Sequence, residues 1–424
     1  MSSQRIDNFG KINREKQLRF SWENKNYFGY EGDSLASALL ANDIRIVGRS
    51  FKYHRPRGIM SCGVEESGGL VTIGTGDKKD PNVRATSQEL YEGLIASGQN
   101  AFPSVNFDLG SVNNYLSRFF AAGFYYKTFM GIPPFEWGKG TAVWMFFEKF
   151  IRKAAGMGRV SRLPDPDTFE HANDFCDILV VGSGPAGIAA AKEAADKKLD
   201  VILVEQDNFI GGDQLSETSF DSSNTLAELR SLGVRVMKRT TAFGLYDNCV
   251  LGLIERVKDQ SNPTNKELPK QRFWIVRAKH VIIGSGAFER HIAFNNNDVP
   301  GSMTVNASKH YLNRYGVLTG KNIVISSSKL KGIDCYHSIE SCLDGIGQAI
   351  RTKPVFIIGG RTIYYEFFKF SSWLHITQLN NHYDADTFFP FSMKEIEKKF
   401  KKTNEKVLSK FCTYSLWSRM QNGK

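Results

Sequence analysis

The sequence predicts an α/β protein with several domains, and three observations support this prediction. A strand pattern, a glycine-rich turn and an alanine-rich helix follow one another from residue 177 to residue 198, and a second strand comes next. Strand and helix patterns then keep alternating toward the C-terminus, as they do in parallel α/β sheets. Residues 1–106 instead contain short strand patterns around one helix, which indicates a smaller β-rich unit. A chain of 424 residues is long enough for each unit to bury its own core.

The patterns divide the chain into four zones, namely residues 1–106, 107–172, 173–320 and 321–424. In the first zone, residues 20–32 predict two strands around a turn, Asp33 opens a helix, and residues 68–76 predict a strand. The second zone is rich in Phe, Tyr, Trp, Gly and Pro and has no clean period. We interpret it as an irregular connection that packs on neighbouring domains.

The third zone begins with a buried strand, Asp177–Val181, and a glycine turn that opens a helix. In such a turn Gly182 permits the tight bend, Gly184 lets a pyrophosphate approach the backbone, and Gly187 lets helix and strand pack closely. The helix start offers free N–H groups and a partial positive charge to phosphates. Glu205 ends the next strand, where a carboxylate accepts hydrogen bonds from an adenosine ribose. These features predict a Rossmann-like site for NAD or FAD rather than NADP.

Two later glycine segments extend this candidate site. Gly212 and Asp213 come where related folds bring a second glycine loop near the nucleotide. Gly284 and Gly286 follow a strand that closes such a domain, and the alternative for them is a simple turn at the end of a strand. The predicted cofactor-binding residues of this first site are Gly182, Gly184, Pro185, Ala186, Gly187, Glu205, Gly212, Asp213, Gly284 and Gly286.

Composition and charge exclude several classes of protein. No apolar run reaches the roughly 18 residues of a membrane span, and the polar start lacks a secretory segment, so we expect a cytoplasmic protein without a membrane partner. Much of the net charge of +11 comes from residues 391–424; we interpret the lysine-rich stretch 394–406 as a solvated helix and predict no nucleic-acid partner. The six cysteines form no CxxC pair, which predicts no metal site.

Several motifs in the first three zones point to a known family. They are FKYHRPRGIMSCGVEE, NVRATSQELYEGL, AAGFYYKTFM, CDILVVGSGPAG, VEQDNFIGGD and GAFERHIAFNNNDVPGSM. Over about residues 20–320 the chain resembles the N-terminal part of the alpha subunit of heterotetrameric sarcosine oxidase. The resemblance implies an NAD-binding subunit that works with a separate, flavin-bearing beta subunit.

The N-terminal unit resembles a small ferredoxin-like domain of the β-grasp type. A plant-type 2Fe–2S cluster needs four cysteine thiolates. Residues 1–106 contain one cysteine, Cys62, so we predict no iron–sulfur cluster. The basic stretch Lys52–Arg57 would either contact a flavin phosphate or a partner, or form a solvated loop.

From Lys321 onward the chain resembles the C-terminal half of dihydrofolate reductase, a parallel α/β half-domain. The matching stretches are NIVISSS, PVFIIGGRTIYYEFF, WLHITQL, HYDADTFFP and FCTYSLWSRM. The resemblance implies that Gly359 and Gly360 approach the pyrophosphate of NADPH and that Tyr364 lies near the nicotinamide. It also implies Ser326 and Ser327 near the adenosine phosphate and Thr377 in the substrate pocket.

Three functions remain open on this sequence. The first is an NAD-binding oxidoreductase component of the sarcosine oxidase alpha type, truncated and fused to a partial dihydrofolate reductase. The second is an NADPH-dependent dihydrofolate reductase with an N-terminal extension, although the acid and the mobile loop of that family belong to its missing half. The third is a catalytically inactive fusion of gene fragments. No catalytic residue can be assigned, and we expect no independent turnover.

Overall fold

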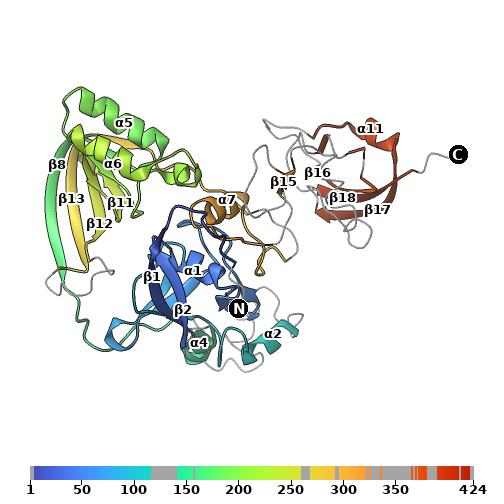
Figure 1. Ribbon diagram of the computed structural model, residues 1–424. Helices are drawn as coiled ribbons and strands as arrows, with labels where there is room; N and C mark the ends of the chain where they lie inside the picture. The colour runs from blue at the N-terminus through green and yellow to red at the C-terminus, as the bar shows by residue number, and fades with distance from the viewer. Residues whose placement is uncertain are drawn as a thin grey trace. The chain divides into compact units, whose positions relative to one another are not determined.

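The computed structural model describes most of the N-terminal three quarters of the chain and parts of the remainder (Figure 1). The described residues are 4–115, 141–155, 158–258, 268–291, 296–320, 324–325, 335–336, 364–365, 368–369, 371–379, 389–409 and 412–420. Two compact units can be separated, Met1–Lys321 and Asn322–Lys424. No helix in the described ranges is long and apolar enough to cross a membrane.

The first sheet of unit 1 has five strands in the order β2-β1-β7-β5-β6. These strands are β1 (Asn13–Trp22), β2 (Lys25–Glu31), β5 (Leu70–Ile73), β6 (Asp80–Arg84) and β7 (Leu94–Gly98). The β1–β2 hairpin turns at Glu23 and Asn24, which both have positive φ, as a two-residue hairpin turn requires. The predicted pair of strands around a turn and the predicted strand at β5 are confirmed.

Helix α1 (Leu35–Ala41) is buried along its whole length against this sheet. Its N-cap is Ser34, whose hydroxyl accepts a hydrogen bond from the Ser37 amide, so the helix does not open at Asp33 as predicted. Asp33 instead forms a buried ion pair with Arg5. The smaller elements that follow are β3 (Gly48–Arg49), β4 (Pro56–Arg57), η1 (Gly76–Lys78), η2 (Leu109–Ser111) and α2 (Val112–Tyr115).

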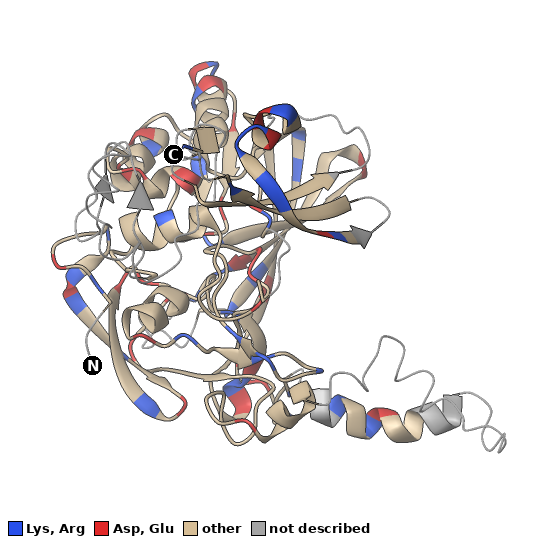
Figure 2. Cartoon of the chain, turned by 90° about the vertical axis from the view of Figure 1, so that its right-hand side faces the viewer, with Lys and Arg blue, Asp and Glu red and all other residues tan. Residues whose placement is uncertain are grey.

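The aromatic-rich zone contains a helix that the sequence analysis did not predict. Helix α4 (Thr141–Ala155) has an ion pair one turn apart between Glu148 and Arg152, and its charged residues are coloured in Figure 2. Phe146 and Phe150 lie on one face with a ring distance of 5.5 Å. The prediction of an irregular connection is therefore wrong for these residues. The helical spacing was overlooked because aromatic residues are frequent throughout this zone and hide the period. Residues 116–140 lie outside the described ranges.

The second sheet of unit 1 has six strands in the order β10-β9-β8-β13-β12-β11. They are β8 (Phe169–Val181), β9 (Val201–Val204), β10 (Arg235–Met237), β11 (Thr240–Tyr246), β12 (Val250–Arg256) and β13 (Gln271–Ile283). The first four strands in this order are parallel, and β12 pairs antiparallel with both of its neighbours. The sequence predicted β8, β9 and β13. It indicated one continuous strand over residues 234–246, where the structure has the two separate strands β10 and β11 at opposite edges of the sheet, and it did not indicate β12.

Helices α5 (Pro185–Asp196) and α6 (Ser222–Ser231) cover one face of this sheet, and their side chains share a core with β8 and β9. The core on the other face joins Ile202 of β9 to Leu253 of β12. Strand β11 also contacts β9, although three strands separate the two in the sheet. The sheet is therefore strongly curled, and its antiparallel strands lie over the parallel ones. Two short helical turns, η3 (Gly212–Ser216) and η4 (Asp247–Cys249), lie in the loops.

The last helix of unit 1, α7 (Val305–Asn313), is N-capped by Thr304. Its residues Ala307 and Tyr311 belong to the hydrophobic core of the first sheet, together with Val317. Segments some 280 residues apart in sequence, such as β1 and α7, therefore build one core.

Unit 2 has a short parallel pair, β14 (Val324–Ile325) and β15 (Cys335–Tyr336), and a three-stranded sheet in the order β16-β18-β17. The sheet strands β16 (Trp373–Leu379), β17 (Phe400–Ser409) and β18 (Cys412–Arg419) pair antiparallel throughout. The prediction of a parallel half-domain is therefore wrong for this described sheet. The mixed α/β class of the whole chain is confirmed.

The lysine-rich stretch of unit 2 is a helix only at its start. Helix α11 (Met393–Glu397) begins with a capping box between Ser392 and Glu395. Strand β17 begins three residues after this helix ends, so the predicted helix over 394–406 is wrong. Phe400 is buried beside Trp417 in the core of this unit, and the backbone that follows pairs with β18.

Candidate functional site

Three glycines bring β8, β13 and α5 close together at the carboxyl end of the parallel strands. Gly182 has φ of 95°, and a Cβ added to it would lie 2.6 Å from the carbonyl oxygen of Gly284. A Cβ on Gly187 would collide with the carbonyl oxygen of Gly182. No larger residue fits at Gly182 or Gly187 without moving a backbone. The predicted roles of a tight turn and of close helix–strand packing thus match the geometry.

Gly184 is different because a Cβ there would meet no atom within 4 Å. It is the N-cap of α5, Pro185 occupies the first position of the helix, and Pro185 and Ala186 are exposed. A proline at this position removes an amide that would lack a partner in any case. The amides of Ala186 and Gly187 and the positive end of the helix dipole remain available to an anion. The open space beside Gly184 is therefore suited to a phosphate group.

Glu205 lies directly beneath this turn and is 8% exposed. One carboxylate oxygen accepts hydrogen bonds from the amide (2.9 Å) and the hydroxyl (2.5 Å) of Ser183, and the other accepts one from the amide of Asp207 (2.9 Å). A carboxylate can accept about four hydrogen bonds, so Glu205 retains capacity for a ligand hydroxyl.

The second glycine loop lies against the first. The Gly211 amide donates to the carbonyl oxygen of Ser183 at 2.9 Å, and a Cβ on Gly212 would lie 3.1 Å from the Cα of Gly184. Asp213 points outward and is 3.2 Å from His310, whose pKa is lowered because burial outweighs the attraction of this carboxylate. Gly286 has a positive φ but no atom near its Cβ position.

The structure thus brings together most of the residues predicted for the first site, which are Gly182, Gly184, Pro185, Ala186, Gly187, Glu205, Gly212 and Gly284. Of the candidate residues of unit 2, the structure describes Tyr364 and Thr377. Gly359 and Gly360 lie outside the described residues, as do Ser326 and Ser327. Tyr364 has its ring 5.6 Å from that of Phe389, and Thr377 is exposed on β16.

One ion pair beside the site was not predicted, and it joins the buried Arg314 to Asp207, whose side chain is 35% exposed. Arg314 donates to both carboxylate oxygens of Asp207, at 2.8 and 3.1 Å. Burial would raise the pKa of Asp207, but the Arg314 guanidinium outweighs it and holds that pKa below its usual value. Asp207 stands only two residues after Glu205, so its position in the sequence could have indicated a role at this site. No motif marks Arg314, because only the folded chain brings it to this loop.

The basic stretch Lys52–Arg57 is not a solvated loop. Arg55 and Arg57 both form ion pairs with Asp298, and the buried ring of His54 lies 2.6 Å from the carboxylate of Asp108. The two ion pairs with Asp298 hold the N-terminal unit against the segment that leads to α7.

The loop from Met60 to Gly69 is organised by the buried carboxylate of Glu66. One of its oxygens accepts hydrogen bonds from the amides of Met60 (2.8 Å) and Ser61 (2.7 Å). The other accepts from the amides of Gly68 (2.6 Å) and Gly69 (2.9 Å). The same loop contains Cys62, where burial raises the pKa of the thiol to about 12.

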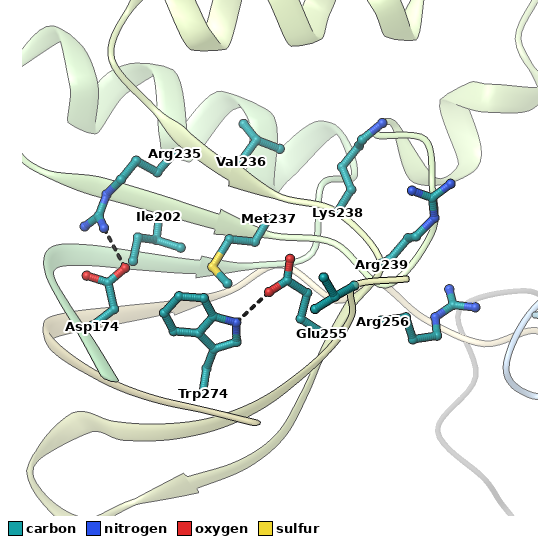
Figure 3. Close-up of a pocket in the computed structure, with 11 residues that line it drawn as sticks. Asp174, Ile202, Arg235, Val236, Met237, Lys238, Arg239, Glu255, Arg256 and Trp274 are labelled. Atoms are coloured by element: carbon teal, nitrogen blue, oxygen red, sulfur yellow. Dashed lines mark hydrogen bonds and ion pairs between the residues drawn. The ribbon is translucent and has the colours of Figure 1, made fainter. Parts of the chain in front are cut away.

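A separate pocket of about 330 Å³ lies where the curled strands meet, and Figure 3 shows its lining residues. Arg235 pairs with Asp174 on one side, and the indole N–H of Trp274 donates to Glu255 at 2.7 Å. Burial and the nearby Arg239 lower the pKa of Lys238 at its rim. The predicted cofactor residues do not line this pocket, so it is distinct from the glycine turn.

Three parts of the chain match known protein families. Residues 177–298 match the family described as FAD dependent oxidoreductase, and residues 15–101 match the 2Fe-2S iron-sulfur cluster binding domain. Residues 309–416 match dihydrofolate reductase.

The chain is also similar to curated alpha subunits of sarcosine oxidase. It is 43% identical to the subunit of Rhizobium meliloti (strain 1021) over 363 residues, which cover 84% of this chain and 36% of that protein. It is 29% identical to the subunit of Corynebacterium sp. (strain U-96) over 75% of this chain and 29% of that protein. The predicted resemblance is confirmed, and the chain spans about a third of the length of these relatives.

Among solved structures, the L-proline dehydrogenase of P. horikoshii is similar to this chain. The TM-score is 0.47 at 19% sequence identity, over 81% of this chain and 54% of that chain.

The predicted cofactor set of NAD, NADPH in the C-terminal region and no iron–sulfur cluster is wrong. The match of residues 177–298 to an FAD family overturns the first part, and the match of residues 15–101 to a 2Fe-2S domain overturns the last. The glycine turn and Glu205 are features for binding the ADP portion, which NAD and FAD share. The motif alone therefore could not distinguish NAD from FAD. Counting cysteines asks only whether four thiolates are present for a plant-type cluster. The match of residues 15–101 instead identifies the type of domain.

The 60–69 loop does not itself supply a plant-type ligand set. The first three ligands of that type are spaced C-x4-C-x2-C. In this loop Ser61, Glu66 and Gly69 stand at that spacing, and Cys62 is the one cysteine between residues 15 and 101.

Proposed function

We propose that the turn between β8 and α5 binds the ADP portion of FAD, and that the chain acts as an FAD-binding oxidoreductase component of the sarcosine oxidase alpha type. The observation that supports this most directly is the open helix start at Gly184 beside the partly satisfied carboxylate of Glu205. The family match over residues 177–298 and the alpha-subunit relatives agree with it.

Each part of the ADP portion has a matching group at this turn. The pyrophosphate would accept hydrogen bonds from the amides of Ala186 and Gly187 and gain from the α5 dipole, which is worth about 0.3–1 kcal/mol for each charge near a helix end. The remaining acceptor capacity of Glu205 would bind a ribose hydroxyl. The same negative charge would repel a 2′-phosphate.

We also propose the division into four parts that the sequence predicted. If the strands of the first sheet are numbered along the chain, they lie side by side in the order 2-1-5-3-4. This order supports a ferredoxin-like β-grasp unit in residues 1–106. Residues 173–320 would form the Rossmann-like unit, although its last part, α7 to Val317, packs in the core of the first sheet, and residues 107–172 would form the connection. The family match over residues 309–416 supports a half-domain of the dihydrofolate reductase type in residues 321–424.

The relatives are subunits by name, which supports a multi-subunit assembly. We propose a flavin-bearing beta subunit as the partner, so that oxidation of an amine would occur on that subunit while this chain supplies the dinucleotide site. Co-expression with such a subunit and affinity purification through a tag on this chain would detect the complex. Recovery of this chain alone would contradict the proposal.

Substitution at Gly184 tests the proposed FAD site. The purified chain should quench flavin fluorescence on titration with FAD, and Gly184→Val should weaken binding by about tenfold or more, because the new side chain would fill the phosphate space. Ala189→Val, on the exposed face of α5, is the matched control. Unchanged FAD affinity in Gly184→Val, or no FAD binding by the wild-type chain, would contradict the proposed function.

A further inference from the structure

We infer that Arg314, at the end of α7, is a positioning residue that sets the Glu205 carboxylate for dinucleotide binding. The inference rests on the proposed FAD site and adds a residue from a distant part of the sequence. Arg314 lies over one hundred positions after Glu205 and belongs to a helix whose core residues pack on the first sheet.

The Arg314 guanidinium is held in one orientation. It donates two hydrogen bonds to Asp207, and it lies 4.9 Å from the ring centre of Tyr315 and 5.4 Å from that of Phe209. The residue is 9% exposed. A bidentate, stacked and buried guanidinium of this kind cannot be replaced by an ammonium without loss of geometry.

Asp207 transmits this orientation to Glu205. Its amide donates to one carboxylate oxygen of Glu205 at 2.9 Å, while its carbonyl oxygen accepts from the amide of Arg239 at 3.0 Å. The residue is thus fixed through its backbone and its side chain. If the Arg314 pair is lost, the Asp207 amide can turn away and the Glu205 carboxylate loses one of its three donors.

Helix α7 also holds the second glycine loop. Asn313 donates to the carbonyl oxygen of Ser216 at 3.0 Å, and Lys309 forms an ion pair with Glu217. On its other side, the Tyr311 hydroxyl donates to the carbonyl oxygen of Ser61 at 2.9 Å. Helix α7 and its C-cap Arg314 therefore contact three segments: Asp207 after β9, the second glycine loop, and the 60–69 loop of the N-terminal unit.

A double-mutant cycle separates positioning from general stability. FAD affinity is measured by flavin fluorescence for the wild-type chain, Arg314→Lys, Glu205→Gln and the double variant, and thermal unfolding is recorded for each. Arg314→Lys should weaken FAD binding about tenfold. In the Glu205→Gln background the same change should have little further effect, because the two residues act through one carboxylate.

Arg235→Lys is the matched control, because Arg235 also pairs with aspartates but at the amino end of the strands. It should leave FAD affinity unchanged. Wild-type affinity in Arg314→Lys, or fully additive losses in the double variant, would overturn the inference while the proposed function stands. Absence of FAD binding by the wild-type chain would instead overturn the proposed function and this inference with it. If Arg314→Lys unfolds, Asp207→Asn replaces it in the cycle with the same expectations.

Discussion

At the scale of single residues, the candidate site depends on paired charges, of which Glu205, Glu66 and Arg314 are buried and Asp207 is partly exposed. Glu205 and Glu66 have backbone amides as their main partners, whereas Asp207 depends on the guanidinium of Arg314. Removing one member of a buried pair leaves the other charge without compensation, which is more costly than losing an exposed pair. The stability of unit 1 should therefore respond to the protonation of Asp207.

The Asp207–Arg314 pair predicts a defined loss of stability in acid. The pKa of Asp207 is below its usual value in the folded chain, so its contribution is complete above the unfolded value of about 3.9 and declines as the pH falls through the lower folded value. Asp207→Asn should therefore lower the thermal midpoint at pH 7, and the difference from wild type should shrink below about pH 4. Thermal unfolding of both proteins from pH 7 to pH 3 measures this. A difference that stays constant over that range would contradict it.

At the scale of elements, the strand–turn–helix of β8 and α5 could be predicted from the sequence because its contacts are local. Gly182 and Gly187 are explained by close backbone approaches within that unit and to the residue after β13, whereas Gly184 borders open space. Strand β12 forms a local hairpin with β11, and β17 forms one with β18, so the sequence could have indicated both. The antiparallel pairing of β16 with β18 could not be predicted, because it joins segments that are far apart in the sequence. The contact of Arg314 with Asp207 was missed for the same reason.

Alanine substitutions at Gly187 and Gly184 should differ in their effect on the stability of unit 1. Gly187→Ala should destabilise unit 1 by about 1–3 kcal/mol, because its Cβ would collide with the carbonyl oxygen of Gly182 and force α5 away from β8. Gly184→Ala has free space for its Cβ and an ordinary backbone conformation, so it should unfold close to wild type. Urea unfolding of the two variants makes the comparison. Equal destabilisation would show that the approach at Gly187 does not limit packing.

At the scale of the whole molecule, the resemblance to sarcosine oxidase over about residues 20–320 overlaps the dihydrofolate reductase match over residues 309–416. The hydrophobic core shows to which unit the shared residues belong. The match to dihydrofolate reductase begins at residue 309, within α7. Yet Tyr311, Tyr315 and Val317 are buried in the core of the first sheet. The physical boundary between the units therefore lies near residue 321 rather than at the start of that match.

Two truncated chains should show where this boundary lies. A chain of residues 1–321 keeps α7, Arg314 and the complete first core, and it should fold and bind FAD with the affinity of the full chain. A chain of residues 1–308 lacks Tyr311 and Val317, whose loss from a core costs several kcal/mol in total, so it should unfold at a clearly lower temperature and bind FAD weakly or not at all. Thermal unfolding and FAD titration of both chains decide the matter. Equal behaviour of the two would place the boundary before α7 and would remove the structural basis for a role of this helix at the dinucleotide site.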